Sequence, residues 1–261
     1  IGPQAWFVRQ LLPDSIPVHI LVPPGSSPHA FEPGPADLVR MERSAAYLRI
    51  GHIGFELAWS EKIRGMYPDK PIFDLSDGVP LISGHQCEDG HEHAGHEHEV
   101  MGTDPHIWMS VSNARIIAEN TRKALLEVMP EQREVIDYNF ERMLVDIDEL
   151  DLETRRIIEG SGTTSFAIFH PALSYYALEF GLEQLAIEDE GKDPSPAHMR
   201  DVMDRIKEKG VSTILVQREF NQEQARVIAD EAGLEVMIID PLSPDWLKSL
   251  KSITHAITRK P

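Results

Sequence analysis

The chain has 261 residues, of which 41% are hydrophobic, so it can bury the core of one large domain or two modest ones. Its formal net charge of −18 argues against nucleic acid as a partner, because binding to phosphates requires clustered lysine and arginine side chains. The sequence contains no run of about 18 apolar residues, so it predicts no membrane-spanning helix. The single cysteine, Cys87, excludes an internal disulfide framework.

The first part of the chain predicts short strands alternating with helices. The segment VHILV is apolar and β-branched and stops at a Pro-Pro-Gly turn, which is typical of a buried strand. Proline opens the helix that follows. We expect a strand over 18–22, a helix over 35–43, a strand over 45–51, a helix over 55–66 and a strand over 71–76.

A histidine-rich loop follows over residues 84–100. It holds five histidines and five carboxylates between His85 and Glu99. Imidazole is the commonest transition-metal ligand in proteins, so the loop predicts metal handling; the alternative is a solvated polar loop without a role. Glycine and proline around it place it on a long connection. Its histidines are His85, His91, His93, His96 and His98.

A long helix is expected in the middle of the chain, from Pro130 to about Gly160, after a shorter helix over 113–128. About 30 residues of α-helix span roughly 45 Å, enough to join two lobes. The alternative is two helices broken near Asp151. The apolar positions that follow one helical face are Ile136, Phe140, Met143, Ile147, Leu150 and Ile157.

Strands and helices alternate again after residue 160. Strands are expected over 165–170, 183–187, 213–217 and 234–240, with helices over 171–180, 195–209, 221–232 and 243–257. This alternation implies βαβ units with parallel sheets. The predicted fold is therefore α/β, with two lobes of parallel β-sheet flanked by helices and joined by a single long rigid helix. We divide it into an N-terminal lobe over 1–128, a connecting helix over 129–160 and a C-terminal lobe over 161–261.

Four candidate metal ligands lie at strand ends or in loops, where α/β proteins bind their ligands. His29 follows the first strand, His106 follows the histidine-rich loop, and His170 and Asp240 each end a strand. Three imidazoles and one carboxylate suit Zn²⁺, whereas Mg²⁺ and Ca²⁺ prefer oxygen ligands. Taken singly, each histidine also suits a structural role and Asp240 a turn; their joint placement favours a metal site.

Five motifs stand along the chain in this order: PPGSSPHAFEP at 23–33, DPHIW at 104–108, FHPALSYY at 169–176, EGKDPSP at 190–196 and IDPL at 239–242. They resemble, in the same order, those of the metal-binding solute-binding proteins of ABC importers, the zinc/manganese cluster A-I family. The resemblance runs from residue 18 to about residue 257.

This resemblance implies a periplasmic or extracytoplasmic protein that captures a divalent metal and delivers it to the membrane permease of an ABC importer. It implies that His29, His106, His170 and Asp240 are the ligands. Manganese members commonly have glutamate where this chain has His170, so Zn²⁺ is favoured over Mn²⁺ as cargo. The histidine-rich loop also resembles the zinc members and is expected to be an accessory metal collector.

The chain departs from the family at its start, where the usual first strand is missing. It begins at Ile1 without a methionine, so we expect a processed or trimmed start that lacks any signal or lipid-attachment sequence. Localisation therefore follows from the resemblance alone.

Acidic residues near the ligands are candidates to hold the imidazoles from behind, because a metal-bound histidine usually donates its other N–H. They are Glu32, Asp104, Glu190 and Glu219.

The rival function is a zinc-dependent hydrolase, in which three ligands and a water form an open site. The helical H-E-x-x-H motif is absent from the sequence, so we predict a binding protein rather than an enzyme.

Overall fold

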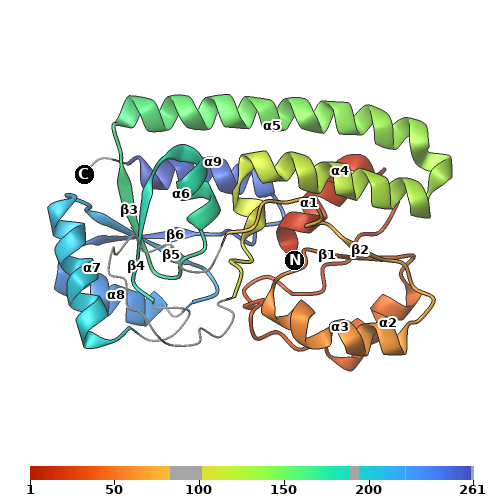
Figure 1. The fold of residues 1–261 in the computed structure, drawn as a ribbon, viewed down its shortest axis with the longest axis horizontal. Coiled ribbons are helices and arrows are strands. Elements are labelled where there is room, and N and C mark those ends of the chain that lie inside the picture. The colour runs from red at the N-terminus through yellow and green to blue at the C-terminus, as the bar shows by residue number, and fades with distance from the viewer. Residues whose placement is uncertain (83–101, 189–193, 221, 260–261) are drawn as a thin grey trace, which may run out of the picture.

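The computed structural model describes residues 1–82, 102–188, 194–220 and 222–259. Two groups of α/β elements lie side by side beneath one long helix, α5 (Arg133–Ser161), which runs along an edge of the molecule over both groups (Figure 1). This confirms the predicted fold class. The division at residues 128 and 160 stays a prediction.

Helix α5 is continuous, so the alternative of two helices broken near Asp151 is wrong. A 3-10 turn over Pro130–Gln132 leads into it, and Gly162, with φ of +69°, ends it in the left-handed conformation that glycine adopts readily. Near its end Ile158 is buried rather than Ile157. The buried face comprises Ile136, Phe140, Met143, Ile147, Leu150, Thr154 and Ile158.

The C-terminal group contains a parallel four-stranded sheet in the order β4-β3-β5-β6. Ala167 and Val216 pack with the helices on one face, whereas Phe166, Ile168 and Leu215 belong to the core on the other face. Both faces are therefore buried, as expected for parallel strands. The strands are β3 (Ser165–Ile168), β4 (Glu183–Ala186), β5 (Thr213–Gln217) and β6 (Glu235–Ile239), and the helices are α6 (Ser174–Phe180), α7 (Pro196–Glu208), α8 (Gln222–Ala232) and α9 (Trp246–Ile257).

The N-terminal group contains a parallel pair of strands, β1 (Tyr47–Arg49) and β2 (Ile72–Asp74), with helices α2 (Pro35–Arg43) and α3 (Gly54–Met66) on one side (Figure 1). Buried Glu56 ties α3 to β1, because its carboxylate accepts hydrogen bonds from the backbone N–H groups of Ile50 and Gly51 at 3.2 and 2.7 Å.

The strand predicted over 18–22 is wrong. These residues pair with no strand and follow an irregular path. Pro17 and Pro23 flank the segment and lack the N–H that a sheet ladder requires, which is a physical reason for the difference. The apolar character of the segment has another use, since Val22 is buried in the core and Val18 and Leu21 pack against it.

Helices α1 (Gly2–Leu11), α4 (Val111–Val128) and α9 pack together beneath α5. The rings of Trp6 and Phe7 lie 5.0 and 5.2 Å from that of Trp246, so the first helix contacts the last. Within the described part of the chain, none of the helices combines the length and apolar character that crossing a bilayer requires.

Candidate metal centre

Three of the four predicted ligands lie together. His29, His106 and His170 each offer one ring nitrogen, and these nitrogens all lie within 4.8 Å of one another. The distances between ring centroids are 5.4 Å for His29–His106, 5.1 Å for His29–His170 and 5.3 Å for His106–His170. Tetrahedral Zn²⁺ with Zn–N bonds of about 2.0–2.1 Å would hold two such nitrogens about 3.3 Å apart. The three rings are thus arranged to close on one small ion.

His29 lies in an irregular loop that packs against the start of α3. The N–H of Phe55 donates to the carbonyl of Pro28 at 3.3 Å. Gly54 touches the loop so closely that a Cβ there would lie 2.5 Å from the backbone oxygen of His29. The rings of Phe31 and Phe55 meet edge to face at 5.5 Å. Helix α3 therefore sets the position of the His29 backbone.

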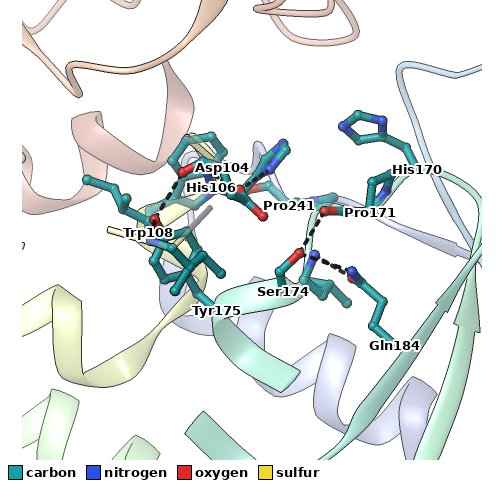
Figure 2. Close-up of polar contacts among 12 residues, drawn as sticks. Asp104, His106, Trp108, His170, Pro171, Ser174, Tyr175, Gln184 and Pro241 are labelled. Atoms are coloured by element: carbon teal, nitrogen blue, oxygen red, sulfur yellow. Dashed lines mark hydrogen bonds and ion pairs between the residues drawn. The ribbon is translucent and has the colours of Figure 1, made fainter. Parts of the chain in front are cut away.

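His106 is held by Asp104. One carboxylate oxygen of Asp104 lies 2.8 Å from both the Nδ1 and the backbone nitrogen of His106. Both residues are buried, and they lie side by side in Figure 2. With Nδ1 donating to the carboxylate, Nε2 carries the lone pair that a metal needs. Trp108 packs in the core, and its indole N–H donates to the carbonyl of Pro241 at 3.0 Å.

His170 follows β3 and is held on three sides. Its Nδ1 lies 2.7 Å from Glu188, its backbone carbonyl accepts from the buried Gln217 amide at 2.5 Å, and its ring stacks on Phe220 with centroids 4.6 Å apart. Within the described chain, Nε2 of His170 is buried and has no hydrogen-bond partner. A buried nitrogen without a partner costs free energy unless something binds it. The site therefore fits a metal ion.

The electrostatics of the site favour neutral imidazoles. Burial, together with the charges of His106 and His170, lowers the pKa of His29 from 6.5 to about 3. Burial also lowers the pKa of His170, against the opposing effect of the hydrogen bond that His170 donates to Glu188. Burial alone would raise the pKa of Asp104, but the charge and hydrogen bonds of His106 outweigh it and bring the pKa below its usual range. At neutral pH the rings of His29 and His170 are thus uncharged, and each has one nitrogen without a proton that can bind a metal.

Asp240 follows β6 and is not part of the three-histidine group. Its carboxylate lies 3.3 Å from the guanidinium of Arg218. Glu219 is close enough to Asp240 and His106 for their charges to act on its carboxyl group. Burial and the charge of Asp240 raise the pKa of Glu219 to about 7. This side of the site therefore holds two carboxyl groups, one of them able to stay protonated near neutral pH.

The remaining candidates are one exposed acid and residues that the structure does not describe. Glu32 is exposed. Glu190 and the five histidines of the loop, His85, His91, His93, His96 and His98, lie outside the described residues. Sequence reasoning missed Glu188 and Gln217, which contact His170 directly. The strand ladder places Glu188, since its N–H donates to the carbonyl of Phe169 at 2.9 Å.

Two α/β groups under one helix, with exposed His29 and buried His106 and His170 converging from distant segments, define a metal-binding protein of the solute-binding class. The chain belongs to the family described as "ZnuA: Zinc-uptake complex component A periplasmic", which matches residues 1–260.

Named relatives agree with this membership. The chain is 26% identical over 243 residues to the zinc-binding lipoprotein AdcA of Streptococcus pneumoniae (strain ATCC BAA-255 / R6), covering 90% of this chain and 48% of AdcA. It is 27% identical to the high-affinity zinc uptake system protein ZnuA of Bacillus subtilis (strain 168), covering 92% and 76%. A crystal structure of ZnuA superposes with a TM-score of 0.87 at 30% identity, covering 99% and 95%. The chain spans about half the length of the AdcA relatives it matches.

Proposed function

We propose that this protein captures Zn²⁺ outside the cytoplasm and delivers it to the membrane permease of an ABC importer. His29, His106 and His170 supply nitrogen ligands, and Asp240 supplies the fourth ligand after leaving Arg218. The observation that carries the proposal is the buried Nε2 of His170, which lies with the other two imidazoles and has no hydrogen-bond partner among the described residues. The names of AdcA and ZnuA, which state zinc binding and zinc uptake, support it.

The ligand chemistry supports zinc over manganese as cargo. Three imidazoles are borderline donors, which together with one carboxylate suit Zn²⁺, whereas Mn²⁺ binds more weakly to nitrogen and favours oxygen. Asp104 and Glu188 hold two of the rings from behind and raise their basicity. The five histidines of residues 85–99 are proposed to collect additional zinc rather than to form the main site.

A zinc hydrolase is the second candidate, and Glu219 is the observation that favours it. A carboxyl group whose pKa is raised to about 7 beside a metal site could serve as a general base. A fourth protein ligand would remove the open coordination position that hydrolysis requires. Zinc-loaded protein should therefore show no turnover of an activated ester, and turnover lost in Glu219→Gln would favour the hydrolase instead.

Calorimetric titration with zinc tests the proposed site. The wild type and a variant lacking residues 85–99 should each bind one tight equivalent. His170→Ala should lose orders of magnitude in affinity, because one of few inner-sphere bonds is removed. His255→Ala, an exposed histidine on α9, is the matched control and should bind like the wild type. Equal affinity of His170→Ala and the wild type would sink the site assignment.

Delivery needs a separate measurement. Cells that express the protein together with its permease should take up radioactive zinc from limiting medium, and manganese should compete poorly. With His170→Ala in place of the wild type, uptake should fall to background. Uptake that does not depend on this residue would argue against the transport role while leaving zinc binding intact.

A further inference from the structure

The hydroxyl of Tyr175 joins two separate segments beside the metal centre. Tyr175 is the second residue of α6 and is buried. Its hydroxyl donates to the carbonyl of Asp104 at 3.0 Å and accepts from the N–H of Ile82 at 3.2 Å. The N–H of Asp104 donates in turn to the carbonyl of Ile82 at 3.1 Å. The three residues therefore form a closed ring of hydrogen bonds, which we call the Tyr175 ring.

The Tyr175 ring acts on a ligand through Asp104. The backbone of Asp104 belongs to the ring, while its side chain holds both Nδ1 and the backbone nitrogen of His106 at 2.8 Å. A carboxylate can place an imidazole only as well as its own backbone is placed. Tyr175 thus fixes the position of His106 through Asp104, without contacting His106 itself.

The same segment that carries Tyr175 also carries His170. Gln217 holds the backbone of His170, and Gln184 accepts from the N–H of Leu173 at 2.9 Å and donates to Ser174 at 3.1 Å. Figure 2 shows Ser174 between His170 and Tyr175, with Gln184 on the side of Ser174 away from Tyr175. The segment 170–175 is therefore tied to the sheet at His170 by Gln217 and just before Tyr175 by Gln184, so the positions of His170 and Tyr175 are set together.

We propose that Tyr175 is a positioning residue of the metal centre, whose hydroxyl sets the place of His106 relative to His170 through Asp104. The inference rests on the proposed zinc binding and deepens it. The neighbouring Tyr176 provides a contrast: its buried hydroxyl pairs with Thr254 of α9 at 2.8 Å, away from the three histidines.

The test compares zinc affinity in Tyr175→Phe and Tyr176→Phe, measured by competition with a chelator. Each change removes one buried hydroxyl and keeps the aromatic side chain, so both should lower the melting temperature of the metal-free protein. Tyr175→Phe should weaken zinc binding about fivefold, less than the roughly tenfold or more expected for a direct partner of a ligand. Tyr176→Phe should leave affinity unchanged. Wild-type affinity in Tyr175→Phe, or an equal loss in both variants, would overturn the inference.

A double-mutant cycle with Asp104→Ala, which removes the oxygen that holds His106, separates positioning from general stability. If Tyr175 acts through Asp104, Tyr175→Phe should change affinity less than twofold once Asp104 is altered, because the path to His106 is already broken. Losses that multiply independently would contradict the inference. A wild type that binds zinc no better than His170→Ala would overturn the proposed function itself, a result distinct from a normal wild type with an unaffected Tyr175→Phe.

Discussion

His170 shows how single residues prepare the metal centre. Glu188 accepts from Nδ1 of its ring, Gln217 fixes its backbone and Phe220 covers one face of the ring. Its Nε2 is buried and has no partner among the described residues. A nitrogen that water does not reach offers its lone pair without first shedding a hydrogen bond. The fold has therefore already removed water from this nitrogen, so zinc binding does not need to supply that free energy.

The lowered pKa of His29 predicts a pH effect on the stability of the metal-free protein. Below pH 6.5 the unfolded chain binds a proton at His29 that the folded chain does not bind until about pH 3. The free energy of unfolding therefore falls as the pH falls through this window. His29→Gln cannot take up this proton, so its stability should fall less steeply than that of the wild type between pH 6.5 and about 4.

Chemical denaturation of both metal-free proteins at several pH values measures this difference. Glu219, whose pKa is raised to about 7, acts in the opposite sense, since its folded form keeps a proton that the unfolded form loses. It is common to both proteins, so the difference in slope isolates His29. A steeper fall in His29→Gln than in the wild type would contradict the predicted direction.

Motif and strand-end position were enough to single out the histidines that meet in space, and proximity in sequence was enough for Asp104 beside His106. They did not reveal Glu188 or Gln217. Those residues reach His170 because β3 lies between β4 and β5 in a particular register, and sequence alone leaves that register open. Asp240 as fourth ligand stays a prediction, since Arg218 holds its carboxylate here.

At the scale of elements, the contact between α3 and the His29 loop predicts an effect of Gly54→Ala. Alanine is a better helix former than glycine, so the helix itself would tolerate the change. Its methyl group, however, would lie 2.5 Å from the backbone oxygen of His29 and must push the loop away. We expect zinc affinity to fall about tenfold, in line with losses when a ligand is displaced by its supporting shell.

Gly65→Ala is the matched control for this prediction. Gly65 lies on the same helix, and a Cβ there would meet nothing within 4 Å. This variant should keep wild-type zinc affinity and gain up to about 1 kcal/mol of stability. Chelator competition on both variants decides the matter: equal affinities would mean that α3 does not set the position of His29.

The elements differ in how well their sequences predict them. Helix α5 is predicted because its apolar positions repeat along one face for almost its whole length. Helix α1 was not predicted: eight of its ten residues are buried, so it lacks the polar face that marks a surface helix. The segment 18–22 has the composition of a strand, and only its flanking prolines argue against pairing.

At the scale of the whole molecule, one hydrophobic core crosses from the first lobe to the second. It contains Phe7 and Ile50, Ile147 of α5, and Ile168 and Leu250. Polar contacts strengthen this connection: the indole N–H of Trp246 donates to the carbonyl of Trp108 at 2.7 Å, and Glu179 of α6 accepts from the first two N–H groups of α4 at 2.8 and 2.9 Å. Neither lobe can unfold without exposing part of the other.

This shared core predicts that the metal-free protein unfolds in a single calorimetric transition, with equal van't Hoff and calorimetric enthalpies. In a variant lacking residues 85–99, zinc should move that whole transition upward, because the three-histidine site exists only in the folded chain; free zinc at 100 times its Kd adds about 2.7 kcal/mol. His170→Ala should lose most of this shift while still unfolding in one step. Two transitions, of which zinc moves only one, would mean that the lobes unfold separately and that the ligands from the two sides are not held by a common core.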